Sequence, residues 1–186
     1  SKLIFGGRRL TPYLRPHFVT RKDWSRITAI CETVFGALQK VKDAAVADEA
    51  ILDELGITEV ERELVRIDPG YPHVSPNARL DSFLTDDAYS FVELNGESPA
   101  GIAYADAAYD IFSSLPVMKE FSKDYNVRPL YGRRLMLDVL LSSYEEFLGR
   151  KPERPPRIAI VDLAGVPTVK EFELFREFFE QAGYPS

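Results

Sequence analysis

The stretch Arg157-Ile158-Ala159-Ile160-Val161-Asp162 carries apolar side chains at both alternating positions, a pattern typical of a strand buried in a parallel sheet. A loop with Gly165 and Pro167 follows it. A helical pattern then runs from 168 to 182, with four phenylalanines as its apolar side. This order predicts the first β-α unit of a nucleotide-binding-like domain. Because one strand cannot make a parallel sheet, we expect the chain to be the front part of a longer protein.

The Pro-rich segment 151–156 lies directly before this unit and is rigid, polar and poor in helix formers. We therefore predict two domains, a helical region over 1–150 and the start of an α/β domain over 151–186. The expected fold class is α/β with α+β character.

The first region is predicted to be mainly helical. Thr20 with Asp23 indicates a helix start, and helical spacing of apolar residues continues it to about Ala47. A second short helix ends near Gly56. The capping box Thr58 with Glu61 starts a third. Further helices are expected from about 100, with a break at 115–116, and over 130–148.

Between these helices, alternating residues over 80–84 and 90–95, joined by a turn at Asp86-Asp87, predict a β-hairpin. Side chains two residues apart on a strand point to the same face. Glu93 and Asn95 therefore share one face of their strand, and Arg79 and Asp81 share one face of theirs. A carboxylate beside an amide oxygen suits Mg²⁺, and an arginine can hold a carboxylate or phosphate with two hydrogen bonds. Spacing alone leaves open an ordinary surface hairpin carrying solvated charges.

Composition narrows the class of protein. The formal charge is -6 and the isoelectric point is about 5.1, which disfavours binding to a nucleic-acid backbone. The sequence has neither a signal-peptide pattern nor an apolar run of the ~20 residues that a membrane span needs. The expectation is a cytoplasmic protein that contacts no membrane. Two lone histidines, His17 and His73, lack the paired spacing of a zinc site.

The motif Glu93-Leu94-Asn95-Gly96-Glu97-Ser98-Pro99-Ala100-Gly101, preceded by Arg79-x-Asp81 on the hairpin, resembles circularly permuted ATP-grasp proteins related to glutathionylspermidine synthetase. Leu14-Arg15-Pro16, after a Gly-Gly-Arg arm, is similar to the beginning of such proteins. The resemblance covers the whole chain but only the front portion of the family, including the beginning of its pre-ATP-grasp domain.

The resemblance implies an ATP-dependent carboxylate-amine ligase that forms a peptide bond through an acyl-phosphate. By this resemblance Glu93 and Asn95 hold Mg²⁺, Arg79 is catalytic, and Ser98 and Asp81 contact substrate. Its substrates are small-molecule or peptide carboxylates and amines. The ATP-binding module of the family is missing here, so Mg²⁺ and ATP are expected only in the full-length protein, and this chain is expected to be inactive alone.

Two other functions remain open. One is a noncatalytic binding or assembly domain with an ATP-grasp-like fold, in which Glu93 and Asn95 only line a pocket. The other is a small Mg²⁺-dependent hydrolase using Asp81, Glu93 and Glu97, although Glu97 is out of phase with the Glu93 face. An unfinished sheet also predicts association into a homo-oligomer.

Overall fold

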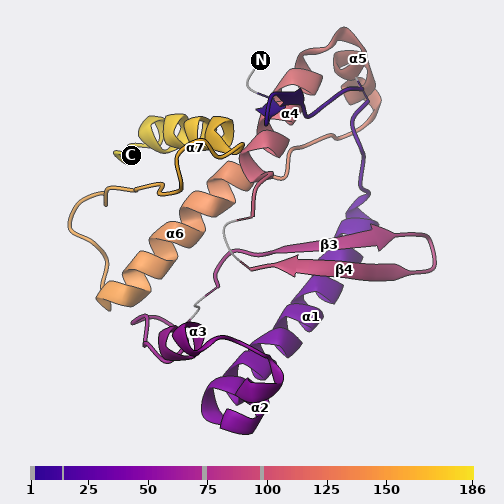
Figure 1. Cartoon of the computed structure of the whole chain (residues 1–186). Helices are drawn as coiled ribbons and strands as arrows, with labels where there is room; N and C mark the ends of the chain where they lie inside the picture. The colour runs from indigo at the N-terminus through magenta and orange to yellow at the C-terminus, as the bar shows by residue number, and fades with distance from the viewer. Residues whose placement is uncertain (1–2, 14, 73–74, 97–98) are drawn as a thin grey trace. The chain divides into compact units, whose positions relative to one another are not determined.

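The computed structural model describes residues 3–13, 15–72, 75–96 and 99–186 (Figure 1). The chain divides into two compact units, one formed by residues 17–72 and the other by residues 1–16 together with 73–186. Both helices and strands are present, and both sheets are two-stranded and antiparallel in the described ranges. We call the units the inserted unit and the main unit and describe each by itself.

The inserted unit contains three helices, α1 (Arg21–Ala47), α2 (Glu49–Glu54) and α3 (Glu59–Leu64). Thr20 caps α1 by accepting a hydrogen bond from the Asp23 backbone N–H at 3.1 Å, which confirms the predicted start. The predicted end at Ala47 and the helix before Gly56 are also confirmed. Arg62 of α3 pairs with Glu49 of α2 at 2.7 Å and also with Asp53, so ion pairs join the two short helices.

The predicted capping box at α3 is confirmed. The Thr58 hydroxyl accepts from the Glu61 backbone N–H at 3.3 Å, while the Glu61 carboxylate accepts from the Thr58 backbone N–H at 2.7 Å. The backbone hydrogen bond from Thr58, with help from its hydroxyl, lowers the pKa of Glu61. The charged carboxylate therefore favours the folded helix end.

This linkage predicts how α3 responds to acid. Because the folded pKa is lowered, the contribution of Glu61 is complete above the usual glutamate pKa and is lost as the pH falls through the folded value. In an NMR titration of the Glu61 carboxyl carbon we expect a pKa below the ordinary glutamate range. Replacing Thr58 by alanine should raise this pKa only part of the way, because the hydroxyl is lost while the backbone N–H remains. An ordinary glutamate pKa in the unmodified protein would contradict the capping box.

The described residues of the main unit form two hairpins and four helices. Its elements are β1 (Ile4–Phe5), β2 (Arg8–Arg9), β3 (Arg79–Leu84), β4 (Tyr89–Asn95), α4 (Ile102–Ser114), α5 (Pro116–Asp124), α6 (Gly132–Leu148) and α7 (Val169–Gln181). The predicted hairpin, the break before Pro116, and the helix ended by Gly149 are confirmed. Gly149 ends α6 in the left-handed region at φ 63°, which favours glycine.

The core of the main unit brings the beginning of the chain onto α4 and α7. It is a cluster of Leu3, Ala103, Tyr104, Ala107 and Leu174. The Tyr104 hydroxyl donates to the Ile4 carbonyl at 3.0 Å. Burial, reinforced by the nearby Glu171 carboxylate, raises the pKa of Tyr104, so the phenol stays a neutral donor.

Two helix N-termini in the main unit are capped from other helices. Residues Gly101 and Tyr131, at the caps of α4 and α6, make no side-chain cap hydrogen bond. Instead, Glu171 of α7 accepts from the backbone N–H groups of Gly101 and Ala103 at 2.9 and 2.8 Å. Asp106 of α4 accepts from Gly132 and Arg133 of α6 at 2.9 Å each. Carboxylates thus tie α7 to α4 and α4 to α6.

The contact between α4 and α6 requires a glycine. A Cβ atom at Gly132 would lie 2.8 Å from the Ile102 Cγ2 atom and 3.2 Å from the Ile102 carbonyl oxygen. The preceding Tyr131 adopts a left-handed conformation at φ 56°, which is uncommon for a residue with a side chain. The left-handed backbone at Tyr131 lets the start of α6 approach Asp106 closely.

The predicted strand over 157–162 is wrong for this structure, since the segment forms no strand. The Ile158 N–H donates to the Pro185 carbonyl at 2.9 Å, and the Val161 side chain is 89% exposed. A parallel strand needs a neighbour to share its backbone hydrogen bonds, and the described residues supply none. The predicted helix after it is confirmed as α7, which packs on α4 and α6.

Candidate functional site

The hairpin β3-β4 brings four of the predicted site residues onto one face. Arg79 lies opposite Asn95, and Asp81 lies opposite Glu93. Directly opposed residues on antiparallel strands point to the same side of the sheet. We call Arg79, Asp81, Glu93 and Asn95 the hairpin cluster.

A β-bulge creates this arrangement. From the turn outward, Phe83 pairs with Ser90 and Ser82 with Phe91, but Asp81 then pairs with Glu93 rather than with Val92. Without the extra residue, Asp81 would face Val92 and Glu93 would lie opposite Leu80, on the other side of the sheet. The bulge therefore sorts charged side chains onto one face, a use of bulges that is common beside functional sites.

The cluster is joined by hydrogen bonds. Arg79 donates through Nε to Asp81 Oδ1 at 2.9 Å, and more weakly through Nη2 to Oδ2 at 3.4 Å. The Asn95 Nδ2 atom donates to Asp81 Oδ2 at 3.2 Å and to Glu93 Oε1 at 3.0 Å. Two carboxylates, an amide and a guanidinium thus lie within one hydrogen-bonded group.

Solvent exposure makes this group easy to rearrange. The Arg79 and Asp81 side chains are 44% and 38% exposed. Exposed ion pairs contribute only about 0–1 kcal/mol, so an incoming anion could take the guanidinium from Asp81 at small cost. The side chains of the cluster can therefore contact an anion as well as one another.

Arg79 also connects the cluster to the turn that follows β4. Its Nη1 atom donates to the Ala100 carbonyl at 2.6 Å. Pro99 and Ala100 line a cleft of about 440 Å³, together with residues of α6, α7 and the 158–162 segment. Glu171 also holds this turn, because its carboxylate accepts hydrogen bonds from the Gly101 and Ala103 N–H groups. The hairpin cluster and the cleft meet at Ala100.

Polar and aromatic groups both line this cleft. Asp162, Thr168 and Glu171 are its polar residues apart from backbone groups, and Phe172, Phe175 and Phe179 form an apolar wall. Asp162 also accepts from the Leu163 N–H at 2.7 Å, which fits a residue that caps its own loop. Such a pocket suits a small organic molecule with one or two polar groups.

Several predicted residues are not placed in this site. Ser98 and Glu97 lie outside the described residues, and so does His73. Among the described residues, those of the hairpin cluster included, no three His, Cys, Asp or Glu side chains gather in a way that could hold a metal ion. Nor does any described helix have the length and hydropathy to cross a membrane.

Sequence reasoning missed Glu171 and the Ala100 carbonyl. Glu171 lies four and eight residues before Phe175 and Phe179, on the apolar side of α7, and only 2% of it is exposed. A charged residue in an apolar stripe is the signal that could have identified it.

No protein family, no curated protein and no solved structure matches the chain. The hairpin cluster and the cleft beside it are therefore the features from which a function can be inferred.

Proposed function

We propose that this chain is the N-terminal part of an ATP-dependent carboxylate-amine ligase of the circularly permuted ATP-grasp type. The observation that supports this proposal is the hairpin cluster, in which Arg79, Asp81, Glu93 and Asn95 share one face beside a cleft. The resemblance of the motif at 93–101 supplies the reaction class. In the proposed enzyme a carboxylate is activated as an acyl-phosphate and an amine then displaces phosphate.

The donor set fits Mg²⁺. Glu93 and Asp81 each place an oxygen within 3.2 Å of the same Asn95 nitrogen, so both carboxylates lie beside this amide. Hard cations favour carboxylate and amide oxygens, usually with water and substrate phosphates completing the shell. We assign Glu93 and Asn95 to the cation, and the amide would turn its oxygen toward it. When bound, Mg²⁺ would neutralise charge on the ATP phosphates.

Arg79 would orient the reacting carboxylate. Its guanidinium is held by Asp81 and by the Ala100 carbonyl, at the edge of the cleft. A fixed guanidinium can pair with a carboxylate or acyl-phosphate through two hydrogen bonds and stabilise charge that develops in the transition state. Asp81, which holds Arg79, would help to position the substrate.

The proposal requires an ATP-binding module beyond the described chain. It also takes residues 151–186 as the start of a pre-ATP-grasp domain. ATP and the acid and amine substrates would then bind between the hairpin cluster and that module.

Calorimetry with Mg²⁺-ATP tests the proposal. We expect binding by the full-length protein and none by residues 1–186 alone. In the full-length protein, Glu93→Ala should weaken binding about tenfold or more, since second-shell changes alone cost a metal site 10–100-fold. Asp87→Ala, at the turn of the same hairpin, is the matched control and should bind as the unmodified protein does. Absence of Mg²⁺-ATP binding by the full-length protein would overturn the proposal.

A specific feature favours the second function, a noncatalytic binding or assembly domain. Arg79 and Asn95 already satisfy the Asp81 and Glu93 carboxylates by hydrogen bonds, so the cluster is electrostatically stable without a cation. In that case the full-length protein would leave Mg²⁺-ATP unbound, and Glu93→Ala would affect only the stability of the hairpin.

A further inference from the structure

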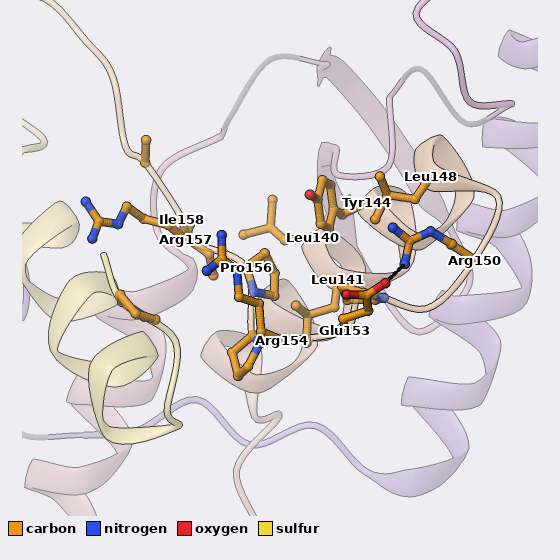
Figure 2. A pocket seen from close by; sticks show the side chains of 14 residues that line it. Leu140, Leu141, Tyr144, Leu148, Arg150, Glu153, Arg154, Pro156, Arg157 and Ile158 are labelled. Atoms are coloured by element: carbon orange, nitrogen blue, oxygen red, sulfur yellow. Dashed lines mark hydrogen bonds and ion pairs between the residues drawn. The ribbon is translucent and has the colours of Figure 1, made fainter.

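A second cleft lies between the C-terminal half of α6 and the segment that follows it (Figure 2). Its volume is about 1140 Å³. Leu140, Leu141 and Leu148 of α6 line one side with the ring of Tyr144, and the Pro-rich segment lines the other. The cleft has an apolar floor and a polar rim, and it is separate from the hairpin cluster.

The rim is strongly basic in an acidic protein. Residues 150–157 carry four basic side chains and one acidic one, whereas the whole chain has a formal charge of -6. Arg150 pairs with Glu153 at 3.4 Å, drawn as a dashed line in Figure 2. Arg154 and Arg157 also line the cleft, and neither makes an ion pair with a described acidic residue. Two cationic groups therefore remain available to a ligand.

Three prolines stiffen the backbone of the segment that carries these arginines. Pro152, Pro155 and Pro156 have restricted backbones, and a residue before proline is pushed to an extended conformation. Arg154 and Arg157 are both exposed on this segment, so their guanidinium groups add positive charge at the edge of the cleft.

We propose that this cleft is a binding site for a small organic anion that combines an apolar body with a phosphate or carboxylate group. The body would rest on the leucines and Tyr144 of α6. The anionic group would pair with Arg154 and Arg157. This ligand site is independent of the proposed ligase function, because none of the hairpin cluster lines it.

An NMR titration with naphthyl phosphate, naphthol and inorganic phosphate tests the site. Naphthyl phosphate should shift backbone amides of residues 140–148 and 150–159. It should bind about tenfold or more tightly than either naphthol or inorganic phosphate, since both the apolar body and charge-assisted hydrogen bonds contribute. High salt should weaken the binding of naphthyl phosphate until its affinity approaches that of naphthol, because salt screens the interaction between charges.

The double substitution Arg154→Gln and Arg157→Gln should reduce naphthyl phosphate binding to the level of naphthol. Arg176→Gln removes one positive charge from an exposed position on α7 outside the cleft and should leave binding unchanged. Circular dichroism verifies that both variants keep their helices. Equal binding of naphthyl phosphate and naphthol, shifts located elsewhere, or an unaffected double variant would each overturn the proposal.

Discussion

Replacing Glu171 by alanine should lower the free energy of unfolding of the main unit by about 3 kcal/mol, the largest effect that we expect from a single substitution. The side chain is buried, and both carboxylate oxygens lie 2.9 Å from the Gly101 nitrogen. Removing it leaves the N–H groups of Gly101 and Ala103 unsatisfied at the positive end of α4. Glutamine should restore part of the loss, because its single oxygen can accept from both N–H groups while its NH₂ group would face the Gly101 donor.

Hydrogen exchange combined with urea unfolding separates this effect from the rest of the molecule. Trp24, the only tryptophan, lies in the inserted unit, so its fluorescence reports the unfolding of that unit. We expect faster exchange of α4 and α7 amides while the Trp24 transition stays unchanged. Glu173→Ala is the control, since its pair with Lys170 is about half exposed. A Glu171→Ala protein as stable as this control would contradict the structural role.

Replacing Asp106 by alanine should cost about 2–3 kcal/mol for a related reason. Asp106 accepts from two backbone N–H groups at the start of α6 and also pairs with the Arg133 side chain at 3.3 Å. Its side chain is only 11% exposed, so water cannot easily replace it. The loss would release the strained turn at Tyr131 and loosen α6 from α4.

Asp110→Ala is the matched control for Asp106. Asp110 contacts the same Arg133 at 3.0 Å, but its side chain is 63% exposed and it caps no helix. A loss of about 0–1 kcal/mol is expected there. Thermal unfolding followed by circular dichroism compares the two proteins, and similar midpoints would show that the backbone hydrogen bonds of Asp106 contribute little.

Local signals predicted most of the helices and the hairpin. Thr20 and Thr58 mark helix starts through hydrogen bonds that span three residues, and Gly149 marks an end through its own backbone conformation. These interactions are complete within one turn of chain, so they can be read without the fold.

The candidate site was predicted only in part. Alternation placed Glu93 with Asn95 and Arg79 with Asp81, but it could not show that the two pairs share a face. That outcome depends on the bulge at Val92, which is a property of how two strands align. The functional roles of these residues stay predictions.

Long-range contacts explain what the sequence did not reveal. Glu171 contacts a turn 70 residues earlier, and nothing in the local sequence of either segment specifies the other. The 157–162 stretch has the composition of a buried strand, but composition cannot provide the neighbour that a strand requires. In both cases the structure depends on contacts between segments that are far apart in the sequence.

The order in which the chain is synthesised determines when Leu3 can pack into the core of the main unit. Leu3 packs with residues 103–107 and with Leu174, so its partners leave the ribosome long after it does. The inserted unit, by contrast, is one continuous stretch of 17–72. It can fold while the rest of the chain is still being made, because its contacts are local. The main unit completes its core only after α7 has emerged.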